Sequence, residues 1–162
     1  MDEKRELLDL LLHSARESTA DIGRQLGIKE AQVEALIAEL EEEGVVRGYQ
    51  AIVDWDRVDD ERVTAIVELN VELDRETKYT DISKRVAKFP EVSDLKLVSG
   101  DYDFAVEVVG DSMHDVSMFV SERIAPIPEV TQTVTHFVMD TYKERGIELG
   151  DHTDDERLTY SP

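Results

Sequence analysis

Cysteine is absent from this sequence of 162 residues, and proline occurs only four times. The absence of cysteine excludes disulfides and thiolate metal sites, and it fits a cytoplasmic protein. No apolar run comes near the roughly 18 residues that a membrane span needs, so we expect no membrane association. The first five residues lead into an amphipathic segment and carry no apolar signal-peptide core. The expected location is therefore the cytoplasm.

Basic residues are also scarce, because 18 lysines and arginines face 38 acids and leave a net charge of −20. Only seven of the bases are lysine, and the acids are spread over every segment. Such a surface is typical of proteins from a salt-rich cytoplasm, as in a halophilic archaeon, where the Debye length falls to about 3 Å at 1 M salt. An ordinary acidic protein that avoids nucleic acid is the alternative. The 41% of hydrophobic residues still allow the core of one medium or two small domains.

The N-terminal part shows the spacing of three short helices. Residues 3–15 and 29–43 carry apolar side chains on one helical face, and a shorter helix follows the capping sequence at residues 18–21. Gly27 and Gly44 end the second and third helices, because glycine tolerates the left-handed conformation. This arrangement predicts a helix-turn-helix. The inward faces comprise Leu7, Leu8, Leu11, Leu12, Ile22, Leu26, Val33, Leu36, Ile37 and Leu40.

The hydrophobic period changes after the third helix. Residues 45–53 predict a strand or wing, so we expect a winged helix-turn-helix domain at residues 1–53. The polar segment 54–61 contains Trp55, the only tryptophan, and predicts a linker.

Residues 62–143 have the element order of a ferredoxin-like domain. Apolar and polar residues alternate over 62–74, which predicts a strand with one wet face. Further strands are predicted at 92–99, 102–109 and 130–141, with helices at 79–89 and after a cap at Asp111. The order β-α-β-β-α-β is that of the split βαβ unit, so the expected fold class is α+β.

An acidic C-terminal tail is expected at residues 144–162. Its acids are typical of disorder, yet Leu158 and Tyr160 alternate as in a short docking strand. We therefore expect partial order in the tail.

The turn at residues 99–104 separates two strands with the sequence Ser-Gly-Asp-Tyr-Asp-Phe. Backbone N–H groups near Gly100 could hold a carboxylate, and Asp101 or Asp103 could hold an ammonium. A plain hairpin turn, with aspartate as turn former, is the alternative.

Three segments in this order resemble the leucine-responsive/asparagine-synthase regulator (Lrp/AsnC, feast/famine) family. They are residues 40–49 (Leu-Glu-Glu-Glu-Gly-Val-Val-Arg-Gly-Tyr), the turn at 99–103, and 133–135 (Thr-Val-Thr). The resemblance spans residues 3–143. It implies an N-terminal domain that binds DNA as part of a dimer. It also implies a ferredoxin-like (ACT-like or RAM) domain that builds homodimers and often octamers, which are tetramers of dimers.

The same resemblance implies a small-molecule effector, usually an amino acid, held between dimers, which sets the oligomeric state. Carried over residue by residue, it places effector contacts at Ser99, Gly100, Asp101, Tyr102 and Asp103, with Thr133 and Thr135 opposite. The alternative for the threonines is simple β-propensity. The tail beyond Lys143 resembles an extension found in a subgroup, and we assign it no function.

The third helix departs from the family pattern, because Lys29 faces six glutamates within residues 29–43, a net charge of −5. In dilute buffer such a helix would repel DNA. In molar salt, contacts from Arg24, Lys29, Gln32 and Arg47 could suffice, and glutamine can pair with adenine. Alternatively, the helix-turn-helix no longer binds DNA, and the chain is an effector-binding or protein-interaction protein.

Nothing in the sequence predicts catalysis or a metal site. The histidines at positions 13, 114, 136 and 152 are far apart, and no nucleophile or glycine-rich phosphate loop is recognisable. His136 shares a strand face with Val134 and Val138, which predicts a core histidine. We therefore expect no enzyme and no cofactor other than an effector. Siroheme decarboxylases, which share the two-domain architecture, are a remote alternative that this acidic chain is poorly equipped to match.

Overall fold

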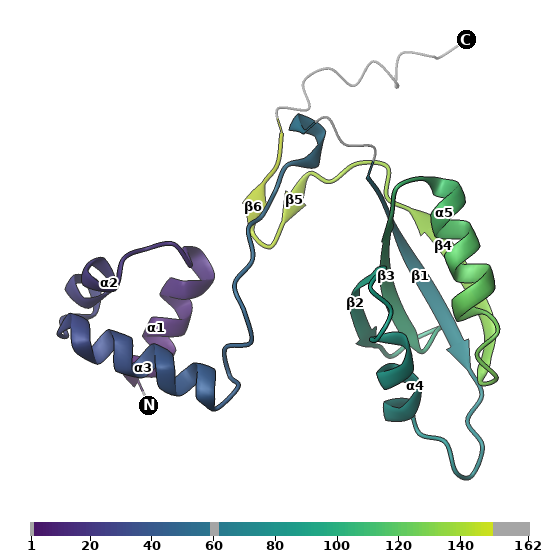
Figure 1. Cartoon of the computed structure of the whole chain (residues 1–162), viewed down its shortest axis with the longest axis horizontal. Coiled ribbons are helices and arrows are strands. Elements are labelled where there is room, and N and C mark those ends of the chain that lie inside the picture. Colours follow the sequence, from purple (N-terminus) through teal and green to yellow (C-terminus); the bar gives the residue numbers. More distant parts are fainter. Residues whose placement is uncertain (1, 59–61, 151–162) are drawn as a thin grey trace. The chain divides into compact units, whose positions relative to one another are not determined.

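The computed structural model describes residues 2–58 and 62–150 (Figure 1). Contacts divide the chain into two units, residues 1–52 and 53–162. Across the described residues, no helix is both long and apolar enough to cross a membrane.

Three helices make up the first unit: α1 (Asp2–His13), α2 (Thr19–Leu26) and α3 (Glu30–Glu42). Their fully buried residues are Leu7, Ile22, Val33 and Leu40, which confirms most of the predicted inward faces. Leu12 was expected on the same face as Leu8 and Leu11, and this expectation is wrong. Its side chain is 83% exposed, because it lies one residue beyond the strip of α1 that meets the other helices.

The two predicted glycine terminators are confirmed. Gly27 and Gly44 have φ values of 70° and 68°, in the left-handed region. After α3, the N–H of Val45 donates to the carbonyl of Leu40 at 2.9 Å, and the N–H of Gly44 donates to that of Glu41 at 3.0 Å. This pair of bonds is the Schellman motif, which satisfies carbonyl groups at the helix C-terminus.

The strand expected at residues 45–53 is not formed in this chain. Val45, Tyr49 and Ile52 are exposed, and no described segment supplies a hydrogen-bonded partner for this stretch. A strand exists only as part of a ladder, so the residue types alone could not create one.

The second unit is built on a four-stranded antiparallel sheet in the order β2-β3-β1-β4. This order confirms the ferredoxin-like prediction. The elements are β1 (Val63–Val71), α4 (Tyr79–Val86), β2 (Val92–Leu97), β3 (Phe104–Gly110), α5 (Met113–Phe119) and β4 (Val130–Phe137). Both helices pack on the same face of the sheet, as Figure 1 shows, and enclose one hydrophobic core.

The alternation predicted for β1 is confirmed. Ala65, Val67 and Leu69 are completely buried beneath the helices, whereas Ile66 on the opposite face is 43% exposed. The prediction that His136 is a core residue is wrong, because the face it shares with Val134 is the open one. There its Nε2 atom lies 3.2 Å from Oε1 of Glu68.

Several element ends differ from the sequence-based prediction. Ser112, not Asp111, caps α5, since the Ser112 Oγ atom accepts the N–H of Asp115 at 3.1 Å. The helix then continues as a π-helical segment, η2 (Val120–Ile124). A short 3₁₀ turn, η1, covers Trp55–Arg57.

The fourth strand stops at Phe137, four residues before its predicted end, and a two-stranded hairpin follows it. Its strands are β5 (Lys143–Glu144) and β6 (Ile147–Glu148), joined through Arg145 and Gly146, which both have positive φ. Two left-handed residues at such a turn match the twist of the strands. The docking strand expected around Leu158 and Tyr160 lies outside the described residues.

Candidate functional site

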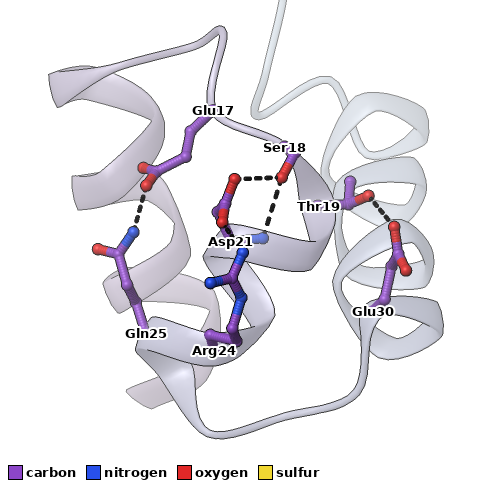
Figure 2. Close-up of polar contacts among 7 residues, drawn as sticks. All are labelled: Glu17, Ser18, Thr19, Asp21, Arg24, Gln25 and Glu30. Atoms are coloured by element: carbon purple, nitrogen blue, oxygen red, sulfur yellow. Dashed lines mark hydrogen bonds and ion pairs between the residues drawn. The ribbon is translucent and has the colours of Figure 1, made fainter.

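A polar network surrounds the N-terminus of α2 (Figure 2). The Oγ atom of Ser18 accepts the backbone N–H of Asp21 at 3.1 Å, and its hydroxyl donates to Oδ2 of Asp21 at 2.5 Å. Arg24, one turn further on, contacts the other carboxylate oxygen. The hydrogen bond from Ser18, followed by the charge of Arg24, holds the pKa of Asp21 below its ordinary value. Asp21 therefore stays charged and keeps Arg24 engaged.

Two contacts fix α3 against α2. The hydroxyl of Thr19 donates to Oε1 of Glu30 at 2.9 Å and joins the first turns of the two helices (Figure 2). A Cβ atom on Gly23 would lie 2.9 Å from the carbonyl oxygen of Ile28. The turn between the helices therefore lies so close to α2 that any side chain at position 23 would clash with its backbone. The orientation of α3 thus depends on a glycine within α2.

The structure gives three of the four predicted DNA-binding residues a partner within the first unit. Arg24 pairs with Asp21. The Oε1 atom of Gln32 accepts the N–H of Lys29 at 3.1 Å and so satisfies a donor at the start of α3. The Nε atom of Arg47 donates to the carbonyl of Gly44 at 2.9 Å, just beyond the end of α3. The side chain of Lys29 has no ion-pair partner among the described residues.

The exposed side of α3 carries alanines and glutamates instead of bases. Ala31, Ala35 and Ala38 are exposed between the acids. Part of the negative charge is compensated, because Nζ of Lys4 lies 2.9 Å from Glu39 and 3.4 Å from Glu43. The remaining exposed acids of the helix are Glu30, Glu34, Glu41 and Glu42.

The predicted effector turn is an open loop between β2 and β3. Gly100 has φ = 134°, a conformation that only glycine adopts without strain. Ser99, Gly100 and Asp101 are exposed, and Tyr102 is half-buried. The loop is closed at its base by the N–H of Val98, which donates to the carbonyl of Asp103 at 2.9 Å.

Asp103, the last residue of the turn, is hydrogen-bonded to two elements, β1 and α4. Its N–H donates to the carbonyl of Leu69 at 2.9 Å, and its Oδ2 atom accepts the N–H of Val71 at 2.8 Å. The hydroxyl of Tyr79, the first residue of α4, lies 3.4 Å from Oδ1. Val71 and Tyr79 were not identified from the sequence, because they are 32 and 24 residues away and no local spacing links them to the turn.

Thr133 and Thr135 lie on β4, two strands away from the turn. They pair with Leu69 and Val67, so they are on the helix-covered face and half-buried. Leu69 in turn pairs with Phe104, which follows the turn directly. With a spacing of about 4.8 Å between strands, Thr133 is roughly 10 Å from Phe104. Within a single chain, therefore, Thr133 and Thr135 do not contact the turn.

Two hollows lie elsewhere. One, of about 590 Å³, is lined by residues of α1 and α2 and the segment between them, including Leu10, His13 and Gln25. The other, of about 290 Å³, lies beside the start of α5, at Glu91 and Phe119. The described residues contain no group of three or more histidines, aspartates or glutamates arranged to hold a metal ion.

A helix-turn-helix joined to a βαββαβ domain with an open, acid-bearing turn defines a class of transcription regulators that respond to small molecules. Comparison with known protein families supports this assignment. The profile of the Lrp/AsnC ligand binding domain matches residues 64–147, and that of a winged helix-turn-helix DNA-binding domain matches residues 2–47. The chain belongs to the Lrp/AsnC family.

Individual relatives support the assignment. The uncharacterized HTH-type transcriptional regulator YugG of Bacillus subtilis (strain 168) is 36% identical over 164 residues, which cover 99% of this chain and 98% of YugG. The proline dehydrogenase transcriptional activator of Rhizobium radiobacter is 23% identical over 142 residues, covering 88% and 90% of the two chains. The domains and relatives are those of transcriptional regulators, not of enzymes.

Solved structures show the same fold. AsnC of E. coli superposes with a TM-score of 0.67 at 18% identity, covering 91% of this chain and 97% of AsnC. A transcriptional regulator from Neisseria meningitidis, solved as a complex with L-Met, has a TM-score of 0.67 at 20% identity, covering 94% and 97%.

Proposed function

We propose that this regulator senses an amino acid at the turn of residues 99–103. The observation that carries the proposal is that polar groups of the exposed turn lack hydrogen-bond partners within the described residues. Within the described residues, the N–H groups of Gly100 and Asp101 donate no hydrogen bond, and the Asp101 carboxylate accepts none. An amino acid offers a carboxylate and an ammonium to match these groups. The L-Met complex of the Neisseria regulator supports this ligand class.

The predicted second wall, Thr133 and Thr135, is supplied in this proposal by another copy of the chain. Support comes from the two-strand separation between Thr133 and the turn. Assembly into homodimers and then octamers would bring the turn of one copy to the threonines of another. Exposed apolar residues on the open sheet face, Ile66 and Val134, agree with self-association. Effector binding would then favour one assembly and one spacing of DNA-binding domains.

A thermal-shift screen of the twenty standard amino acids in concentrated KCl tests the effector. Binding to the native state raises the unfolding midpoint by mass action. Mass measurement with and without the amino acid that binds then tests the change in assembly. An unchanged midpoint for all twenty, together with an unchanged mass, would count against the proposal.

For the first unit, we propose that Arg24, Lys29, Gln32 and Arg47 contact DNA in a salt-rich cytoplasm. High salt screens repulsion between the phosphates and the acidic helix, while short-range contacts persist. The net charge of −20 supports this setting. The proposed domain limits are residues 1–53 for DNA binding, 54–61 for the linker, 62–143 for effector binding and oligomerisation, and 144–162 for the tail.

The intramolecular partners of three of these residues favour a second candidate, in which the helix-turn-helix is a scaffold that no longer contacts DNA. A fluorescence titration of DNA across a salt series separates the two. Sequence-selective binding in molar potassium salt supports the first candidate, and its complete absence supports the second.

A further inference from the structure

We propose that the two aspartates of the turn have different roles. Asp103 is a positioning residue that holds the turn on the sheet, and Asp101 is the acceptor for the ammonium group of the effector. This inference rests on the proposed function of the turn, and it assigns to one carboxylate a role that the sequence left open between two.

The hydrogen bonds of Asp103 tie the turn to β1, to α4 and to Val98 at the other end of the turn. Its backbone N–H reaches β1 at Leu69, and its carbonyl accepts the N–H of Val98, just beyond the end of β2. Its Oδ2 atom accepts the N–H of Val71 at 2.8 Å, where the β1–β4 pairing is irregular. Beyond its pairing with β3, β1 thus obtains a hydrogen-bond acceptor from a side chain.

The second carboxylate oxygen of Asp103 is directed to α4. The hydroxyl of Tyr79 lies 3.4 Å from Oδ1, and the ring of Tyr79 packs edge-on against Phe104, with centroids 5.9 Å apart. Phe104 is buried and immediately follows Asp103. The same two neighbouring residues therefore hold both the polar and the apolar part of Tyr79.

This geometry makes Asp103 a poor ligand-binding residue. Each oxygen already faces a donor of the protein, and the side chain is half-buried. If the carboxylate turned toward a ligand, the part-buried N–H of Val71 would lose its acceptor, which is costly for a backbone group. Asp103 is better suited to fix the backbone that presents the turn.

Asp101 has the opposite properties. It is exposed, and its side chain makes no hydrogen bond or ion pair within the described residues. It directly follows Gly100, whose N–H group is free to hold a carboxylate. An amino acid whose carboxylate binds this backbone would place its ammonium within reach of the neighbouring Asp101 carboxylate.

Three variants of the full-length protein separate the roles. Asp103→Asn keeps an oxygen for the Val71 N–H but loses the charge, whereas Asp103→Ala loses both. Asp101→Asn loses only the charge of the exposed acid. Affinity is measured by calorimetry in concentrated KCl with whichever of the twenty standard amino acids binds the wild type. Hydrogen exchange of the Val71 amide, measured by NMR without any amino acid, reports the positioning role independently.

We expect Asp103→Asn to bind within about threefold of the wild type and to keep the Val71 amide protected, because a neutral acceptor preserves the bond. Asp103→Ala should weaken binding about tenfold and speed exchange at Val71. Asp101→Asn should also weaken binding about tenfold, with exchange unchanged, because only the charge-assisted bond is lost.

Equal loss in Asp103→Asn and Asp103→Ala, with exchange at Val71 unaltered, would overturn the inference and make Asp103 the ammonium acceptor. If no amino acid binds the wild type, the proposed function and the role of Asp101 both fail. The exchange measurement still decides the positioning role of Asp103 in that case. Tyr79→Phe, which removes only the hydroxyl, should speed exchange less than Asp103→Ala does.

Discussion

Asp21 and Arg24 form an ion pair across one turn of α2, and Ser18 donates to the same carboxylate. Arg24 is one of the few bases on the DNA-binding unit, so this pair withholds a positive charge from any phosphate nearby. The pairing is local, and one substitution can release the arginine without disturbing the helical core.

Asp21→Asn should strengthen DNA binding at moderate salt. Removal of the carboxylate charge frees Arg24 for a phosphate, and one added phosphate contact steepens the slope of log K against log salt by about 0.9. Fluorescence titrations over a salt series measure this slope. Glu122→Gln, an equal change of net charge on the other unit, is the control and should leave the slope unaltered. Equal slopes for Asp21→Asn and wild type would show that Arg24 does not reach the phosphates.

Lys29→Ala and Gln32→Ala should separate DNA contact from helix capping. The side chain of Lys29 has no ion-pair partner in the described part of the chain, so its loss should lower the salt slope by about 0.9 and leave stability unchanged. The Gln32 oxygen satisfies the N–H at the start of α3, so its loss should cost about 1 kcal/mol of stability. Chemical denaturation and DNA titration of both variants test the pair. Equal stability losses would contradict the assignment.

Gly23→Ala should displace α3 and weaken DNA binding. The new Cβ would meet the carbonyl oxygen of Ile28 at 2.9 Å, and that oxygen belongs to the backbone and cannot swing away. We expect a net loss of about 1 kcal/mol after the helix propensity of alanine is counted. Gly48→Ala is the matched control, because its Cβ meets nothing within 4 Å, and it should leave thermal stability and DNA affinity near wild type.

Acid should destabilise the second unit partly through Asp74. Its Oδ1 atom accepts the N–H groups of Thr77 at 2.7 Å and Glu76 at 2.8 Å, and these bonds hold the pKa of Asp74 below its ordinary value of 3.8. A lowered pKa in the folded state contributes stability that is present above pH 3.8 and is lost as pH falls below it. Asp74→Asn keeps an acceptor without the charge, so its stability should fall less steeply below pH 4. Denaturation midpoints over this range provide the test, and parallel curves would contradict it.

The sequence was sufficient for features with local causes. Gly27 and Gly44 end helices as predicted, because glycine adopts the left-handed conformation at little cost whatever surrounds it. The alternation in β1 likewise identified the buried residues, since the period of two reflects a sheet with one covered face.

The failures concern features that depend on a distant partner. The strand expected at 45–53 needs a ladder that the described chain does not supply, and the face of His136 depends on which side the helices cover. The hydrogen bonds of Asp103 could not be predicted for the same reason. Its bonds to Val71 and Tyr79 arise only when the sheet brings together positions far apart in sequence.

Because of the close approach at Gly23, the contacts that fix α3 are separate from the residues on its exposed side. The helix is fixed by Gly23, Thr19 and the buried stripe, none of which lies on its exposed side. Substitutions at Ala31, Ala35 and Ala38 should therefore leave the fold intact. The exposed side of α3 can thus be varied at these three positions, independently of the fold, to test whether it affects the choice of DNA sequence.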